Sequence, residues 1–330
     1  MKRSSAIWLI VAASLVFAGS VIFGGVLAAN KWDMKKLSNV EYQEKSYDIT
    51  ENYSGISVLT DAASVRFVAT KGDSCRVECV EPVKAAHTVE VRDGILTVEV
   101  EDTRKWYERI GIFSIGSPRI TVYLPEGKYG VLTVKGSTGD VWIQSKLSFE
   151  KIDVSVSTGD VECFASAEDK ISVRTTTGQI SLGYISASEL DLAVSTGTVR
   201  VLYSWISGDI ALTVRTGSAV LENIICKDLR TIGTTGDVDM KNVVAENAIS
   251  IERDTGEISF VSCDAAELNM TTDTGDIKGS LRSAKTFSVS HTTGTVRLPE
   301  EQTGGRFTVK TDTGDIIISV EEKKVQQNSD

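Results

Sequence analysis

Residues 154–164 read VSVSTGDVECF, and close variants of this stretch recur through much of the chain. Ten Thr-Gly pairs, this one included, follow one another at intervals of 19 or 20 residues. The glycines of these pairs are Gly139, Gly159, Gly178, Gly197, Gly217, Gly236, Gly256, Gly275, Gly294 and Gly314. A fixed period of this length is typical of solenoids, in which each repeat forms one structural unit that stacks on the next.

Apolar residues recur at four fixed distances from each glycine: seven and five residues before it, and two and four after it. Around Gly159 these positions hold Ile152, Val154, Val161 and Cys163. Of the forty such positions, only Thr231 and Gly279 are not apolar. A spacing of two is the period of a strand with one buried side. The sequence therefore predicts an all-β fold, a parallel β-solenoid of about ten 19–20-residue coils over residues 131–320.

An uncharged apolar segment lies near the N-terminus, at residues 6–29. Its 24 residues are enough to cross a bilayer with some tilt. A cleaved secretory signal usually has an apolar run of about 7 to 15 residues, so the length favours one retained transmembrane helix within residues 1–30. The sequence Val26-Leu27-Ala28 also resembles a cleavage site, which keeps a cleaved signal open as the alternative. Lys2 and Arg3 precede the segment, as in export signals.

The remaining regions follow from their patterning. Residues 31–45 are polar and are expected to form a stalk, and residues 46–130 an N-terminal cap of antiparallel strands that covers the end of the solenoid. The least regular part of the cap contains Trp106 and Tyr107, which we assign to cap packing rather than to a binding patch. Residues 321–330 form a polar tail that should discourage end-to-end stacking of rods.

Three local signals stand out in the expected cap. Asp93-Gly94 between two alternating runs predicts a hairpin. Residues 120–125 predict another strand. Around Ala63, apolar residues occupy the same four offsets as around the repeat glycines, which predicts one degenerate coil without a glycine. These residues are Ile56, Val58, Val65 and Phe67.

The formal net charge is −10 at pH 7, and the part after residue 30 carries −12 because Lys2 and Arg3 are the only charges before it. An acidic body of this kind argues against nucleic acid or anionic lipid surfaces as partners. The expected location is the cell membrane, with residues 6–29 as the single membrane contact and the C-terminal body extracytoplasmic.

The cysteines and histidines give no sign of a reactive centre. Five cysteines are an odd number, and Cys75 and Cys79 should lie about 13 Å apart on one strand, too far for a disulfide. We read the cysteines as small buried hydrophobes rather than a disulfide framework. His87 and His291 lie in different regions and are read as surface residues. No catalytic residue, metal or cofactor is therefore expected, and the chain is not expected to be an enzyme.

The residue after the turn glycine is acidic in six of the ten repeats. These six residues are Asp140, Asp160, Asp237, Glu257, Asp276 and Asp315. Stacked in successive coils they would form an acidic ridge, and such ridges can attract Ca²⁺. Aspartate also suits the turn itself, and this interpretation, a solvated corner, is the favoured one.

Three large aromatic residues lie outside the four apolar columns in neighbouring coils. Tyr184, Tyr203 and Trp205 follow their glycines by six or eight residues and can form one small binding patch. An aromatic platform is what a polysaccharide-binding protein would need.

The membrane segment, the strand-rich cap and the repeated STGDV, DTGDI and TTGTV coils resemble a bacterial β-strand-repeat family known as “putative adhesins”, the domain of unknown function 4097. The family includes envelope-stress-associated LiaG-like proteins. The likeness covers residues 40–320 and implies a surface or envelope role without any catalytic residue. The resulting expectation is a non-enzymatic, membrane-tethered envelope protein, an adhesin or an interaction or stress-response scaffold for an unknown envelope protein or polymer. The alternative is a polysaccharide-binding or polysaccharide-active cell-surface protein.

Overall fold

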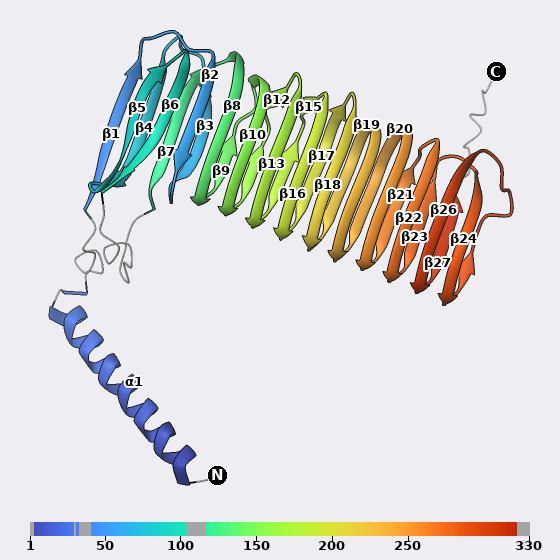
Figure 1. Cartoon of the computed structure of the whole chain (residues 1–330), viewed down its shortest axis with the longest axis horizontal. Coiled ribbons are helices and arrows are strands. Elements are labelled where there is room, and N and C mark those ends of the chain that lie inside the picture. The colour runs from blue at the N-terminus through green and yellow to red at the C-terminus, as the bar shows by residue number, and fades with distance from the viewer. Residues whose placement is uncertain (1–2, 30, 33–40, 104–116, 322–330) are drawn as a thin grey trace, which may run out of the picture.

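The computed structural model describes residues 3–29, 31–32, 41–103 and 117–321. Most of the expected stalk, the segment with Trp106 and Tyr107, and all but the first residue of the expected tail lie outside these ranges. The described residues form an all-β rod with one N-terminal helix (Figure 1), which confirms the predicted fold class.

Helix α1 spans Arg3–Ala29 and lies apart from the strands in Figure 1. Its segment Trp8–Ala29 has 22 residues and a mean hydropathy of 2.3, so it is long and apolar enough to cross a membrane. Large side chains are exposed along it, with Trp8 and Phe17 both 73% exposed. The helix is therefore a membrane span or a signal sequence, because both share this length and composition.

Antiparallel strands form the cap at the N-terminal end of the rod. They are β1 (Tyr42–Ile49), β4 (Cys75–Pro82), β5 (Ala85–Arg92), β6 (Ile95–Asp102) and β7 (Arg119–Pro125). β4 pairs antiparallel with β1 and with β7, and β5 with β6. At the β5–β6 turn, Asp93 and Gly94 have φ angles of 51° and 74°, as the predicted two-residue hairpin requires. The hairpin and the strand at residues 120–125 are thus confirmed.

One coil without a glycine joins the cap to the repeats. It consists of β2 (Gly55–Thr60) and β3 (Ser64–Thr70), which pair in parallel with β8 (Gly127–Thr138) and β9 (Val141–Ile143). Ile56 lies opposite Leu132, and Val65 opposite Val141. This is the register that the degenerate coil around Ala63 predicts. On their other sides β2 and β3 pair with β6 and β7, so the cap continues both walls of the rod.

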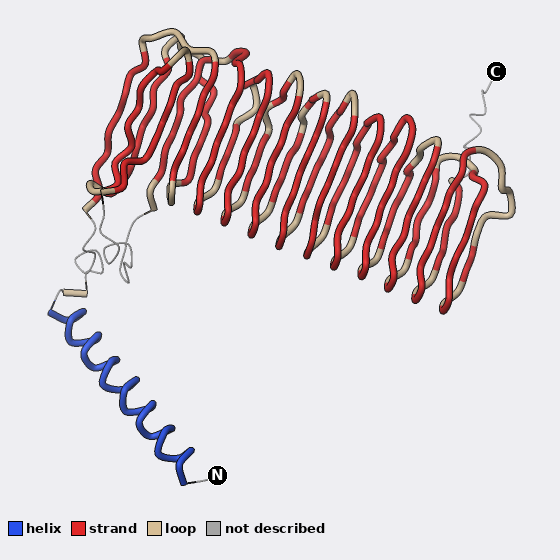
Figure 2. The backbone as a smooth tube through the Cα atoms, in the orientation of Figure 1, coloured by secondary structure: helices blue, strands red, loops and turns tan. Residues whose placement is uncertain are grey.

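The repeats stack as parallel coils of strands (Figure 2). Their further strands are β10 (Leu147–Thr158), β11 (Val161–Cys163), β12 (Ser166–Ala167), β13 (Lys170–Thr177), β14 (Ile180–Gly183), β15 (Ser186–Ala187), β16 (Glu189–Thr196), β17 (Val199–Ile206), β18 (Asp209–Thr216), β19 (Ala219–Thr235), β20 (Val238–Thr255), β21 (Ile258–Cys263), β22 (Glu267–Thr274), β23 (Ile277–Leu281), β24 (Lys285–Thr293), β25 (Val296–Arg297), β26 (Gly305–Thr313) and β27 (Ile316–Val320). The ten turn glycines all have φ between 121° and 153°. A Cβ on Gly197 would lie 1.8 Å from the carbonyl oxygen of Gly178, so the turns stack closely only because they carry glycine.

The four predicted columns form the core, and the structure adds inward positions that the sequence analysis missed. Three residues before the glycine, Val194 and Val214 are buried, and in the supposed variable link Ile224 and Cys226 are buried as well. The link is therefore a third wall of the coil. Its pattern is hidden in the sequence because the link changes length by one residue between repeats.

A buried arginine occupies one of these inward positions. Arg253 is 1% exposed, and its Nη1 donates a hydrogen bond to the carbonyl oxygen of Val214, two coils away (2.8 Å). Gly233 in the intervening coil makes room, since a Cβ there would lie 1.5 Å from Nη1. Burial lowers the pKa of Arg253, and the charge of nearby Asp237 partly offsets this effect.

The coils do not stack in chain order at the C-terminal end. Strand β26 lies between β22 and β24, and β27 lies between β23 and β25. The coil of Gly314 is therefore inserted before the coil of Gly294, which ends the stack (Figure 1). Pro299 offers a reason. It has no N–H to donate and comes just after β25, which has only two residues. The Gly294 coil could therefore form few backbone hydrogen bonds with coils on both of its sides, and the end of the stack requires bonds on one side only. The five-residue β27 covers β23 fully.

Because the Gly294 coil is last, its apolar side chains are only half-buried. These residues are Phe287, Val289, Val296 and Leu298. The last coil of the stack is therefore formed by β24 and β25. The tail expected at residues 321–330 stays a prediction, because only Glu321 of it lies within the described residues.

Candidate functional site

An exposed row of apolar side chains crosses three neighbouring coils in the middle of the rod. We call it the aromatic strip, and it consists of Tyr184, Tyr203, Trp205 and Ile225, which are 48–71% exposed. The rings of Tyr184 and Tyr203 stack with centroids 5.1 Å apart and planes within 2°. Trp205 follows on β17 and lies opposite Ile225 in the next coil. The structure thus brings together the three aromatic residues that the sequence analysis singled out.

The backbone at this strip is unusual. Tyr184 and Tyr203 have φ angles of 58° and 49°, in the left-handed region, at a corner of the coil. The next two coils place asparagines at the same corner, and the amide of Asn242 donates to the side-chain oxygen of Asn223 (2.9 Å). Asparagine tolerates this conformation well, whereas bulky residues adopt it at a cost of about 1–3 kcal/mol. Local backbone preference therefore does not account for the two tyrosines.

The strip borders an open surface pocket of about 310 Å³. Trp205, Ile225 and Val244 supply its apolar lining, while Lys227 and Glu246 add one charge of each sign. Val244 lies opposite Ile225 in the β19–β20 register, so the apolar row continues into a fourth coil. An apolar centre with a charged border is typical of protein contact surfaces.

The acidic ridge lies along the Thr-Gly edge, where each of its five aspartates accepts a hydrogen bond from a neighbouring coil. In each bond the Oδ1 atom of the aspartate accepts the backbone N–H of the residue that follows the turn glycine in the adjacent coil. The bonds run from Asp160 to Asp140 (2.9 Å), Gln179 to Asp160 (2.7 Å), Glu257 to Asp237 (2.9 Å), Asp315 to Asp276 (2.7 Å) and Thr295 to Asp315 (2.8 Å). Hydrogen bonds from Lys278 and from the Asp315 N–H hold the pKa of Asp276 below its usual range. These carboxylates therefore stabilise the stack, whatever else they bind.

The first coils add an open pocket of about 320 Å³ beside this edge. Asp140, Asp160 and Glu162 line it together with Arg66 and Trp142. Carboxylates next to an aromatic ring are the components of a polysaccharide site, but Asp140 and Asp160 already accept backbone hydrogen bonds.

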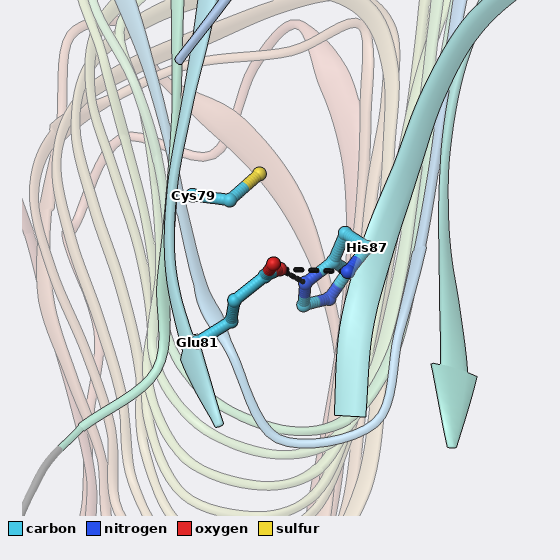
Figure 3. A group of neighbouring side chains, drawn as sticks. All are labelled: Cys79, Glu81 and His87. Atoms are coloured by element: carbon cyan, nitrogen blue, oxygen red, sulfur yellow. Dashed lines mark hydrogen bonds and ion pairs between the residues drawn. The ribbon is translucent and has the colours of Figure 1, made fainter. Parts of the chain in front are cut away.

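A polar cluster lies between the two walls of the cap, and the sequence analysis did not find it. Cys79 and Glu81 on β4 and His87 on β5 point toward one another (Figure 3). Glu81 Oε2 accepts hydrogen bonds from the His87 backbone N–H and pairs with His87 Nδ1, each at 2.7 Å. His87 is 4% exposed and Glu81 is fully buried, so the surface location expected for this histidine is wrong. The alternation of Cys79 and Glu81 on one strand face was the available signal.

The cluster is bordered by further polar groups and by an opening to solvent. Gln43 Nε2 donates to Glu81 Oε1 (3.2 Å), and Lys45 Nζ lies 3.7 Å from the same oxygen. The Oγ1 of Thr60 lies 3.2 Å from His87 Nε2. His87 and Lys45 also line an open surface pocket of about 350 Å³. Every polar atom of the Glu81–His87 pair thus has a partner, and the pair is close to solvent.

A family model describes the repeats and part of the cap. The model, described as Toastrack DUF4097, matches residues 53–213 and 202–329. Together the two matches span well over half of the chain. No curated protein matches this sequence.

Several solved structures match the chain at low identity and with TM-scores below 0.5. A “putative adhesin” from Parabacteroides distasonis ATCC 8503 is 10% identical with a TM-score of 0.48, covering 86% of this chain and 98% of its own. A “putative adhesin” from Parabacteroides merdae ATCC 43184 is 11% identical with a TM-score of 0.46, covering 86% and 98%. A “putative lipid binding protein” from P. distasonis is 14% identical with a TM-score of 0.36, covering 72% and 96%. At such values the names of these proteins do not transfer to this chain.

Proposed function

This chain belongs to the Toastrack DUF4097 family, and from that premise we propose that it is a non-enzymatic rod of the cell envelope. Helix α1 tethers the rod to the membrane, the body is extracytoplasmic, and the aromatic strip contacts another envelope component. The observation that carries the proposal is the strip itself, in which two tyrosines and a tryptophan are exposed side by side on a rigid parallel sheet.

The strip has the properties of a pre-organised contact surface. Tyrosine and tryptophan dominate binding energy at protein interfaces, and a side chain that is already ordered loses little entropy on binding. The backbone of Trp205 is held by the pairing of β17 with β15 and β19, and the Tyr184 and Tyr203 rings stack on each other. The strained corner under these tyrosines supports a role outside folding, because such strain is concentrated at functional sites.

Site-specific photo-crosslinking in the native envelope tests this contact. A photoreactive amino acid at position 203 or 205 should give a discrete cross-linked product in intact cells. The matched control is Thr213, an exposed residue on β18, a wall that does not carry the strip. Equal products from positions 205 and 213, or no product from the strip, would contradict the proposed contact.

The membrane tether rests on the length and apolar surface of α1. Mass spectrometry of the mature protein distinguishes an anchor, which keeps residues 1–30, from a signal cleaved near Ala28. Protease added to intact cells should digest the body if it is extracytoplasmic. A body that resists digestion until the cells are lysed would overturn the orientation.

A polysaccharide-binding role is the second candidate, and one observation favours it. Tyr203 covers one face of the Tyr184 ring, and among the described residues no second aromatic ring stacks on Tyr184. One face of the Tyr184 ring is therefore not covered by another aromatic ring and is suited to stacking on a sugar. Glycan-array binding that is lost in Tyr184→Ala would support this role, and an array without binding by the wild type would remove it.

A role in the response to envelope stress is a finer form of the first proposal. It rests on the resemblance to envelope-stress-associated proteins. Transcription of the gene after challenge with cell-wall-active antibiotics tests it, with an unrelated stress such as heat as the control. Unchanged transcript levels under both conditions would argue for a constitutive scaffold.

A further inference from the structure

We propose that Cys79, Glu81 and His87 form a binding site for one divalent transition-metal ion, with Zn²⁺ as the expected occupant. The Sγ, carboxylate oxygen and imidazole nitrogen of these residues all lie within 4.8 Å of one another. All three residues are buried in the cap. Figure 3 shows the three side chains directed at a common point between β4 and β5.

The donor set selects the class of metal. Thiolate and imidazole are ligands of Zn²⁺ and related transition metals, whereas Ca²⁺ and Mg²⁺ prefer oxygen alone. Three protein ligands leave a fourth tetrahedral position for water, which the adjoining pocket lined by Lys45 and His87 can supply. The same opening gives the ion a path to the site.

Partners outside the donor set would hold the ligands in place. In zinc sites the second ring nitrogen of a ligating histidine usually bonds an oxygen, and ligating carboxylates are themselves hydrogen-bonded. Here Thr60 Oγ1 lies 3.2 Å from His87 Nε2, which leaves Nδ1 for the metal. Gln43 and Lys45 approach Glu81 Oε1, whereas Oε2 accepts the His87 backbone N–H through one lone pair and can offer its second lone pair to the metal. Both remaining atoms, Nδ1 and Oε2, face each other at 2.7 Å.

Charge balance also fits a divalent ion. A thiolate and a carboxylate together neutralise the two positive charges, while the imidazole binds as a neutral ligand. The thiolate is the form of cysteine that binds metal ions, so binding releases the Cys79 thiol proton to solvent, and affinity should rise with pH.

Cobalt(II) provides the probe, because it substitutes for Zn²⁺ and its thiolate complexes absorb in the near ultraviolet. The full chain in detergent, treated with a chelator and then dialysed, should bind one equivalent of Co²⁺ with a sulfur-to-cobalt charge-transfer band. One equivalent of Zn²⁺ should abolish the band. Elemental analysis of the protein as purified should also find Zn²⁺ at up to one equivalent.

Two substitutions on one strand face separate the site from non-specific binding. Cys79→Ser should lose the charge-transfer band and weaken Co²⁺ binding roughly tenfold or more. Cys75→Ser is the matched control, since Cys75 is a buried cysteine on the same face of β4 outside the cluster, and it should keep both. Glu81→Gln, similar in shape, should also weaken binding. Absence of a thiolate band in the wild type, or its survival in Cys79→Ser, would overturn the proposal whatever the role of the aromatic strip.

Discussion

The cap and the solenoid are built from similar strands, but their residues meet in different ways. In the solenoid each inward side chain contacts the same position of the next coil, so the same residue types recur along each column. In the cap each pairing occurs once, as between Tyr42 and Pro82 or Ala85 and Asp102. Repetition favours apolar columns that stabilise the rod, whereas the single contacts of the cap allow a buried Cys79, Glu81 and His87 cluster.

The largest expected difference between the two regions concerns glycine. Gly197→Ala in the solenoid should reduce the free energy of unfolding by at least about 4 kcal/mol, because the new Cβ would lie 1.8 Å from the Gly178 carbonyl oxygen. Gly94→Ala in the cap hairpin should cost only about 1–2 kcal/mol, since its Cβ would meet nothing within 4 Å. Urea unfolding of the full chain measures both. Equal losses would contradict the close stacking of the turns.

The second comparison sets an inner coil against the end coil. Phe307→Ala should cost about 3–5 kcal/mol, because Phe307 is fully buried between Phe260 and Phe287. Phe287→Ala should cost roughly half as much, since Phe287 is half-buried at the end of the stack. The same unfolding measurement applies. A larger loss for Phe287 would mean that the coils follow chain order.

The third comparison tests the polar cluster against the surface of the cap. In chelator-treated protein, Glu81→Ala should cost about 1–3 kcal/mol, because it leaves the buried His87 N–H groups without an acceptor. Glu101→Ala, at an exposed position on β6, should change stability by less than about 0.5 kcal/mol. Thermal unfolding at pH 7 compares the two variants. Similar small effects would show that the cluster is not needed for folding.

The smallest expected effect lies on the acidic ridge and depends on pH. The folded-state pKa of Asp276 is lowered, so its contribution is complete above the unfolded value and is lost as the pH falls through the lower folded value. Asp276→Asn should therefore cost less than about 1 kcal/mol near pH 7 and nothing below both pKa values. Exposed Asp273→Asn is the control. The midpoint of urea unfolding, measured at pH 7 and at a pH below both pKa values, tests this prediction. A loss of stability in Asp276→Asn that persists in acid would show that the charge of Asp276 is not its cause.

The solenoid could be predicted from the sequence because its contacts repeat. Ten glycines at 19 or 20 residues fixed the turns, and the same offsets around Ala63 located a coil that has no glycine. The aromatic strip could be named in advance for the same reason, since Tyr184 and Tyr203 share one position in successive coils.

Features that depend on contacts without a period could not be predicted. His87 meets Glu81 only because a turn folds β5 back against β4, and nothing in the spacing of the two residues indicates burial. The order of the last two coils depends on which of them pairs more completely with β23. The repeat pattern is the same in both coils, so it does not specify this order. The left-handed corner under Tyr203 was hidden because tyrosine is not a residue that signals such a turn.

The inserted coil bears on how the rod responds to mechanical force. A strand at the end of a stack can peel away by breaking bonds to one neighbour at a time. β26 and β27 are instead bonded on both sides, so tension applied beyond Glu321 must shear two interfaces at once. A rod held at the membrane by its N-terminal end and pulled from its C-terminal end would thus resist unravelling where the load enters.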